Sequence, residues 1–279
     1  MKTSGAPTHT DQAPPALPRD LPAAWERIGA GAAVMRADWL DAARSLPPAA
    51  IDLVYVDPPF NTGATRSGAA GAFQDAWPTL DAYVEWIRAR IIATAPALRP
   101  TGSVLVHVDW RTSHHVRVVL DETLGPDRFV NHLVWAYGLG GSSPRRFARK
   151  HDDILFYCID PAKYWFRAPR VPATSNRMRG QDKKATDVLA IPSINNMSTE
   201  RTGWPTQKPL ALLELLIGAC CPPGGVVMDP CCGSGTTLVG AARIGRAALG
   251  ADIDDRALTL TRSRMASAEA QQKTPQPGG

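Results

Sequence analysis

Short apolar segments alternate along the chain with longer amphipathic segments, and few folds accommodate this pattern. Strands that alternate with helices form a mostly parallel sheet with helices on both faces, because each helix carries the chain back to the start of the next strand. We expect strands at 32–36, 51–56, 103–108, 226–228 and 247–251. We expect helices at 39–45, 80–98, 112–124, 210–221, 236–244 and 256–268. The fold class predicted from this alternation is α/β.

The rest of the chain suggests how this domain is bounded. The apolar segments 131–137 and 152–160 flank a polar loop and predict an antiparallel hairpin at the edge of the sheet. Periodicity is lost over 161–203, and a loop region of this length in a compact domain is usually functional or disordered. The proline-rich start and the polar end predict a disordered arm at 1–21, one domain at 22–270 and a disordered tail at 271–279.

Composition excludes some classes of protein and favours others. A formal charge of +5 mildly favours a polyanionic partner. The five cysteines include no C-x-x-C, so we expect reduced thiols, no zinc site and a cytoplasmic protein. The longest apolar run, 210–221, contains Glu214 and is too short to span a bilayer, and the N-terminus lacks the apolar core of a signal peptide.

The stretch 54–63, with the sequence VYVDPPFNTG, ends a buried strand in an unusual way. Asp57 is followed by Pro58, Pro59 and Phe60, so the segment has a carboxylate and lacks two backbone donors. Such a segment is a poor core and a poor helix start. We interpret it as part of a functional site.

A second stretch combines a strand, a glycine turn and a helix. The strand at 226–228 runs into Asp229, glycines follow at 233 and 235, and a helix opens at Thr236. Glycines let a ligand approach the backbone, and a helix N-terminus offers free N–H groups. A later strand ends on Asp252, where a carboxylate can accept hydrogen bonds from ribose hydroxyls. The G-x-G-x-x-G and P-loop patterns are absent, and a simple helix-capping turn stays an alternative.

Taken together, these stretches resemble the β group of DNA amino-methyltransferases, which use S-adenosyl-L-methionine (AdoMet). The pattern D-P-F-C-G-S-G-T-T occurs as DPCCGSGTT at 229–237, with Cys231 in place of phenylalanine. The pattern P-T-Q-K-P-L-x-L-L occurs at 205–213, and LGADID at 249–254 also matches. The resemblance extends over 34–266. It implies a Rossmann-like methyltransferase fold with a circularly permuted, mostly parallel sheet, and a target-recognition region at about 138–203.

The resemblance also implies roles for individual residues. Asp252 would bind the ribose of AdoMet, Thr206 and Lys208 would lie near its methionine carboxylate, and Asp38 near its adenine ring, although Asp38 could equally cap a helix. The other expected cofactor-binding residues are Asp229, Cys231, Gly233, Ser234, Gly235 and Thr237. The departure at Cys231 affects the packing beside the cofactor.

The family resemblance explains Asp57-Pro58-Pro59-Phe60 as the catalytic element. The Asp57 carboxylate and the Pro58 carbonyl would each accept an N–H of a nucleobase amine and direct its lone pair toward the methyl group. Pro58 and Pro59 would stiffen the turn, and Phe60 would stack on a base rotated out of duplex DNA. Transfer would be direct and in line. Asp57 favours adenine N6 as the target, with cytosine N4 as the alternative, since enzymes that act on the cytosine amine tend to have serine at this position.

Other functions remain to be weighed. Cys231 could suggest a cysteine nucleophile, and His107, Asp109, His114 and His115 could suggest a metal site, but we favour neither. The basic residues Arg145, Arg146, Arg149 and Lys150 are expected to contact DNA phosphates. A catalytically inactive, DNA-binding subunit is a further alternative. The partners considered are double-stranded DNA, a cognate restriction enzyme and a second copy of the chain.

Overall fold

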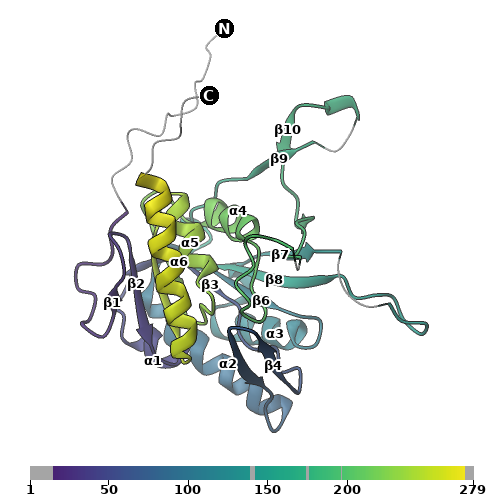
Figure 1. Ribbon diagram of the computed structural model, residues 1–279. Helices are drawn as coiled ribbons and strands as arrows, with labels where there is room; N and C mark the ends of the chain where they lie inside the picture. The colour runs from purple at the N-terminus through teal and green to yellow at the C-terminus, as the bar shows by residue number, and fades with distance from the viewer. Residues whose placement is uncertain (1–14, 139–141, 174–175, 196, 274–279) are drawn as a thin grey trace.

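The computed structural model describes residues 15–138, 142–173, 176–195 and 197–273. Within these residues a nine-stranded sheet has the order β1-β2-β13-β12-β3-β6-β8-β7-β11 (Figure 1). Its strands are β1 (Glu26–Arg27), β2 (Ala32–Arg36), β3 (Ile51–Val56), β6 (Leu98–Val108), β7 (Phe129–Ala136), β8 (His151–Cys158), β11 (Val188–Leu189), β12 (Val226–Asp229) and β13 (Ala247–Asp252). The neighbours from β2 to β6 in this order are parallel. The predicted α/β fold with a mostly parallel sheet is confirmed.

The order of the strands shows where the chain is permuted. The last strands in sequence, β12 and β13, lie between β2 and β3, which belong to the N-terminal part of the chain. From β12 the chain continues through a helix to β13 on one side, and from β3 it continues through a helix to β6 on the other. The boundary between β12 and β3 is therefore a topological switch point, where open α/β sheets bind ligands at the carboxyl ends of their strands.

Helices cover both faces of the sheet (Figure 1). One layer contains α1 (Trp39–Arg44), α2 (Leu80–Thr94) and α3 (Ser113–Thr123), and the other contains α4 (Leu210–Cys220), α5 (Thr236–Arg243) and α6 (Asp255–Lys273). Short 3-10 turns lie at Ala95–Ala97, Pro126–Arg128 and Asn176–Met178. Side chains of β3 alternate between the layers: Val54 and Val56 pack with α1–α3, whereas Leu53 and Tyr55 pack with α4–α6.

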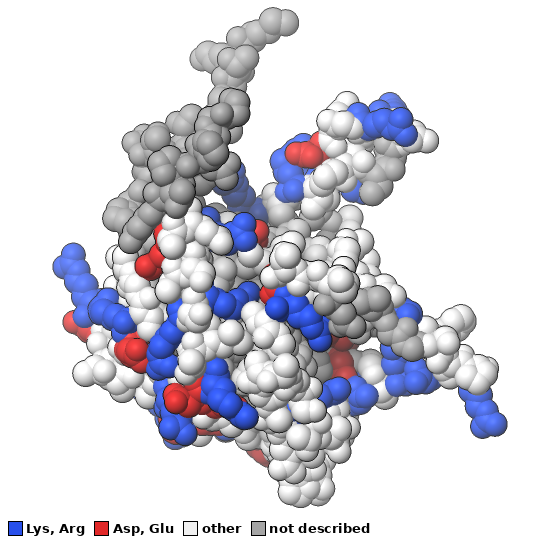
Figure 2. Space-filling view, viewed as in Figure 1, with Lys and Arg blue, Asp and Glu red and all other residues white. Residues whose placement is uncertain are grey.

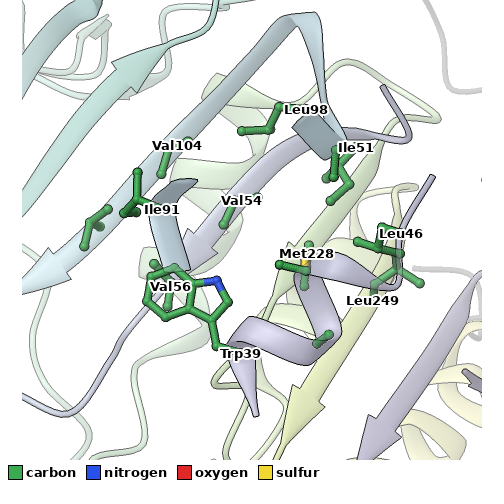
Figure 3. Packing of buried hydrophobic residues seen from close by; sticks show 14 of the residues in the cluster. Trp39, Leu46, Ile51, Val54, Val56, Ile91, Leu98, Val104, Met228 and Leu249 are labelled. Carbon is green, nitrogen blue, oxygen red and sulfur yellow. The ribbon is translucent and has the colours of Figure 1, made fainter. Parts of the chain in front are cut away.

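The packing of the first layer is shown in Figure 3, where Trp39 lies beside Val56 and near Met228. Its indole N–H donates to the Thr94 hydroxyl at 2.9 Å, so the buried polar end of this side chain has a partner. Asp38 caps α1 by accepting from the backbone N–H of Leu40 at 2.8 Å. These contacts place the start of α1 directly after the carboxyl end of β2.

The edge of the sheet differs from the prediction. The expected hairpin forms from β7 and β8, but β8 pairs with β6, and the short strand β11 pairs with β7 on the outside. The hairpin therefore lies one strand in from the edge. The additional strand lies in the stretch that lacks periodicity, and its two residues are too few to show a pattern.

Two small hairpins were not predicted. The first consists of β4 (Ala64–Gly68) and β5 (Gly71–Asp75), and the second of β9 (Arg170–Pro172) and β10 (Asp182–Lys184). The first is fixed by packing, since a Cβ at Gly68 would meet the Gly203 carbonyl at 2.5 Å and one at Gly71 would meet Trp204 at 2.4 Å. The second projects from the body of the molecule (Figure 1).

The ends of the domain also differ from the predicted boundaries. Leu17 is buried, and Leu21 packs against the same core cluster, so the described part of the predicted arm belongs to the domain. Helix α6 continues to Lys273, beyond the predicted boundary at 270. Residues 1–14 and 274–279, where the rest of the arm and tail were predicted, lie outside the described residues. Within the described chain, no helix is both long and apolar enough to cross a membrane.

Candidate active site

A cavity of about 790 Å³ lies at the carboxyl ends of the central strands. Residues that directly follow β2, β3, β6, β12 and β13 line it, as expected for ligand binding at the switch point. The lining includes most of the predicted site residues: Asp38, Asp57, Pro58, Pro59, Phe60, Thr206, Lys208, Asp229, Cys231, Gly233, Ser234, Thr237 and Asp252. The two motifs of the sequence therefore meet in one cavity, because β3 and β12 are adjacent and parallel.

The loop after β3 is held by a carboxylate of the β4–β5 hairpin. Asp75 accepts from the backbone N–H of Asn61 at 2.7 Å and from the Thr62 hydroxyl at 2.6 Å. Asn61 has a left-handed backbone with φ of 55°, a conformation that asparagine tolerates well, and its side-chain oxygen accepts from the N–H of Trp77 at 3.1 Å. The hairpin thus fixes the end of the Asp57–Phe60 segment.

Asp57 has one bonded and one unbonded carboxylate oxygen. The Lys208 ammonium donates to Asp57 Oδ2. Asp57 Oδ1 is buried and has no hydrogen-bond partner among the described residues. A buried acceptor without a partner is costly, so this atom is suited to receive a donor from a ligand.

Phe60 rests on a buried histidine. Its ring stacks on that of His107 with centroids 5.9 Å apart and an interplanar angle of 24°. The ring nitrogens of His107 are 2.8 Å from the Tyr55 hydroxyl and 3.2 Å from Asp152 Oδ2. Burial opposes ionisation of Asp152, but the hydrogen bond from His107 and nearby positive charge lower the pKa of this carboxyl. His107 therefore supports Phe60 rather than a metal ion.

Asp229 lies at the bottom of the second motif. It accepts from the Thr237 hydroxyl and, at 3.1 Å, from the backbone N–H of Cys231. Burial raises the pKa of Asp229 to about 7, and the charges of Asp57 and Asp252 add to this effect. The close approach of these carboxylates gives the cavity a negative character, which favours a cationic ligand.

The glycine turn after β12 contains one glycine that lines the cavity and one that does not. Gly233 has φ of 50°, and its N–H donates to Asp252 Oδ2 at 2.9 Å. Asp252 Oδ1 accepts from the N–H of Asp254 at 2.9 Å. Gly235 has φ of 75° and is absent from the cavity lining, since a Cβ there would meet the Thr261 side chain at 2.6 Å. Gly235 thus serves the packing of α5 on α6.

Three other sequence interpretations can be compared with the geometry. Asp38 lines the cavity, but both its oxygens accept from Arg90 at 2.7 Å in addition to capping α1. Burial raises the pKa of the Cys231 thiol, which disfavours a thiolate nucleophile. No group of His, Cys, Asp or Glu able to hold a metal ion occurs in the described parts of the chain.

Comparison with known proteins identifies the family. A sequence profile of the DNA methylase family that comprises N6 and N4 methyltransferases matches residues 51–263, more than half of the chain. The chain belongs to this family. The resemblance seen in the sequence motifs is thereby confirmed.

Relatives of this DNA methylase include other bacterial DNA methyltransferases. The type II methyltransferase M.ScaI of Streptomyces caespitosus is 29% identical over 254 residues, which cover 84% of this chain and 81% of that one. The DNA adenine methyltransferase YhdJ of Escherichia coli K12 is 24% identical, with coverage of 83% and 82%.

Solved structures share the fold of this DNA methylase. An M1.HpyAVI–SAM complex superposes with a TM-score of 0.60 at 22% identity, covering 84% of this chain and 98% of that one. The cytosine-N4-specific PvuII DNA methyltransferase superposes with a TM-score of 0.61 at 17% identity, covering 89% and 88%. The Rossmann-like methyltransferase fold is thereby confirmed.

The basic loop between β7 and β8 of this DNA methylase reaches the mouth of the cavity. The Arg149 guanidinium lies 3.3 Å from the ring centroid of Trp110, and both residues line the cavity. Arg145 and Arg146 are exposed farther along the loop, and Lys150 is half-buried. Figure 2 shows basic side chains on this loop and on the projecting β9–β10 hairpin.

Several residues of the site could not be recognised from the sequence. Trp204 lies against Gly233, since a Cβ there would meet the indole nitrogen at 2.8 Å. Asp152 and Tyr137 reach the cavity from the β7–β8 hairpin, where the Tyr137 hydroxyl donates to Asp152 at 3.2 Å. Only the position of Trp204, directly before the 205–213 motif, could have suggested a role.

Proposed function

We propose that this DNA methylase transfers a methyl group from AdoMet to the exocyclic N6 amine of adenine at specific sites in duplex DNA. One observation carries the proposal: the Asp57–Phe60 segment and the 229–237 turn line the same cavity. The first offers acceptors for an amine, and the second offers a turn and the carboxylate of Asp229, which would suit the cofactor. A protein that had lost the activity would have no reason to keep both of these segments.

The residues present fit AdoMet. The cavity of about 790 Å³ lies within the range of small-molecule sites. Because Gly233 has no side chain, the turn at the carboxyl end of β12 can pack closely against Trp204. Asp252 ends β13, the next strand, and in Rossmann-like folds a carboxylate at this place binds the ribose hydroxyls. The carboxylates of Asp57, Asp229 and Asp252 suit the positive charge of a sulfonium. These residues would hold the cofactor.

The chain supplies acceptors that activate the amine. A nucleobase amine is a weak nucleophile because its lone pair is delocalised into the ring. Asp57 Oδ1 and the Pro58 carbonyl would each accept one N–H, which turns the lone pair out of conjugation. When bound, AdoMet would supply an electrophilic methyl group with a sulfur leaving group, and the acceptors on Asp57 and Pro58 would direct the amine lone pair toward it. The surplus proton would then pass from the nitrogen to solvent.

Phe60 would hold the target base after it has rotated out of the duplex. One face of its ring is covered by His107, whose position is fixed by Tyr55 and Asp152. A base could stack on the opposite face, as enzymes that act on bases within a duplex require. This arrangement would place the amine beside Asp57, only three residues earlier in the same loop.

Adenine is the proposed target, and cytosine N4 is the alternative. Asp57 occupies the position at which enzymes of the cytosine amine tend to have serine, and the relative YhdJ is named a DNA adenine methyltransferase. The similar fold of the cytosine-N4-specific PvuII enzyme supports the alternative. A pocket wide enough for a purine also admits the smaller pyrimidine ring, so chemistry alone does not choose between them.

DNA contacts are proposed on the projecting basic segments. Arg145, Arg146, Arg149 and Lys150 in the β7–β8 loop would meet phosphates near the cavity. The recognition region at about 138–203 would include the β9–β10 hairpin, whose neighbourhood carries Arg170, Arg177, Arg179, Lys183 and Lys184. A cognate restriction enzyme is a further proposed partner, which the name of the type II relative M.ScaI supports. A homodimer is also proposed, because related enzymes are often dimers.

Transfer of label from AdoMet to DNA tests the proposal. Wild-type protein incubated with methyl-tritiated AdoMet and mixed unmethylated DNA should label the DNA. Asp57→Ala should lower the single-turnover rate by on the order of 10²- to 10³-fold, because it removes an acceptor made ready for the amine. The variant should keep its affinity for DNA, measured by anisotropy. DNA bound by the wild type without any label would instead support an inactive DNA-binding subunit.

A further inference from the structure

The ion pair between Lys208 and Asp57 lies within the cavity and links its two halves. Lys208 belongs to the motif at 205–213, whereas Asp57 follows β3, and 151 positions separate them in sequence. Their side chains are only 10% and 16% exposed. Water and salt therefore screen the pair less than a surface ion pair.

The Lys208 ammonium has further neighbours that fix its position. It lies 5.5 Å from the centroid of the Phe60 ring, within the range of a cation–π contact, and 3.3 Å from the Thr206 carbonyl. Burial opposes ionisation of Asp152, but the contacts with His107 and, after them, the positive charge of Lys208 lower the pKa of this carboxyl. The ammonium therefore lies among the groups that would surround the target base.

The backbone that carries Lys208 is itself held in place. Thr206 adopts a left-handed conformation with φ of 65°, which costs free energy for a β-branched residue and persists only where neighbours enforce it. Gln207 supplies that enforcement. Its side-chain oxygen accepts from the N–H of Thr202 at 2.8 Å, and its amide donates to the Glu200 carbonyl at 2.8 Å. The turn is thus a rigid support for one lysine.

In this geometry the two oxygens of the Asp57 carboxylate have different roles. Oδ2 is engaged by Lys208, and Oδ1 is buried without a partner. A carboxylate that could rotate freely would offer either oxygen to the amine and would lose entropy on binding it. One anchored oxygen leaves the other pointing in a single direction before the base arrives.

We propose that Lys208 is a positioning residue for methyl transfer, which anchors Asp57 Oδ2 so that Oδ1 accepts the N–H of the target amine. This inference rests on the proposed function. It differs from a role for Lys208 at the methionine carboxylate of AdoMet, because it assigns the lysine to the acceptor of the amine and hence to the rate of the bound complex.

The test compares Lys208→Met and Lys208→Arg with the wild type in single-turnover transfer at saturating AdoMet and DNA. Lys208→Met should slow transfer by about 10²-fold, the scale for loss of one preorganised polar contact. Lys208→Arg should recover at least about tenfold of this, since a guanidinium can still engage Oδ2. Arg243→Met is the control. It removes a cation whose contact with Glu214 lies at the far end of α5, and its rate should match the wild type.

A double-mutant cycle with Asp57→Asn separates positioning from a merely structural role. If Lys208 acts through Asp57, Lys208→Met should add little to the slow transfer of Asp57→Asn, even if it also lowers the Tm. Full additivity of the two losses would overturn the inference. So would recovery of the Lys208→Met rate at high AdoMet concentration, which would place the lysine on the cofactor. Absence of transfer by the wild type would be a different result, since it would remove the proposed function itself.

Discussion

At the scale of single residues, the site combines three carboxylates in different surroundings. Asp57 forms an ion pair with Lys208, and Asp252 accepts hydrogen bonds from backbone N–H groups. Asp229 is buried and accepts from the Thr237 hydroxyl. Burial raises the pKa of Asp229 to about 7 and raises that of Asp252 as well. Burial disfavours the charged forms of Asp229 and Asp252, and a positively charged ligand beside them would favour those forms.

Asp229 yields a prediction about stability and pH. Its pKa is raised from 3.8 to about 7 on folding, so the folded protein binds this proton more tightly than the unfolded chain does. The contribution to stability is fully present below the unfolded pKa and is lost as the pH rises through the folded one. Asp229→Asn mimics the protonated acid at every pH. The Tm of this variant relative to the wild type should therefore rise between pH 5 and pH 8, corresponding to at most about 3 kcal/mol.

Thermal unfolding without ligand at the two pH values measures this difference. Asp160→Asn is the matched control, because the hydrogen bond from Lys163 lowers the pKa of this half-buried carboxyl. Its Tm relative to the wild type should be the same at both pH values. An equal effect of pH on the wild type and Asp229→Asn would show that Asp229 does not take up a proton in this range.

At the scale of elements, the hydrophobic periodicity of the sequence predicted the bounds of those strands and helices whose own residues form a regular apolar pattern. Strand β3 has the predicted bounds, and helices α1, α3, α4 and α5 end within a residue of the predicted ones. The β4–β5 hairpin was missed because its sequence has no apolar alternation and is held by Gly203 and Trp204, far along the chain. Leu17 was placed in a disordered arm because a single buried leucine among prolines gives no periodic signal.

In the candidate site, too, contiguous motifs could be predicted from the sequence, whereas contacts between distant residues could not. Both motifs were recognisable because each is contiguous, and adjacency of β3 and β12 brings them together. The contact of Lys208 with Asp57 could not be read from the sequence, since 151 positions separate the two residues. The contact that Gly235 makes possible with Thr261 could not be predicted either, because glycine spacing alone does not show what lies beside the backbone.

The β7–β8 loop yields a prediction about DNA binding. Arg145 and Arg146 are exposed in this loop, and each phosphate contact that they would make would release counterions. Arg145→Ala and Arg146→Ala should each weaken DNA binding and reduce the slope of log affinity against log salt by about 0.9 per lost contact. Arg88→Ala serves as the control, since Arg88 lies on α2 between Glu85 and Glu122. If both loop variants keep the wild-type slope, the loop is only solvated.

At the scale of the whole molecule, the fold places the Asp57–Phe60 segment and the 229–237 turn together at the topological switch point of the sheet. The sheet brings the loop after β3 next to the turn after β12, and Arg149 of the basic β7–β8 loop lines the same cavity. Membership of the DNA methylase family accounts for this combination.

Nucleoside analysis of DNA from a methylation-free host that expresses this protein tests the account most directly. Mass spectrometry should detect N6-methyladenine, and cells that express Asp57→Ala at the same level should lack it. N4-methylcytosine without N6-methyladenine would contradict the assignment of the target amine. Absence of both modified bases, from a folded protein that binds DNA, would contradict the proposed activity itself.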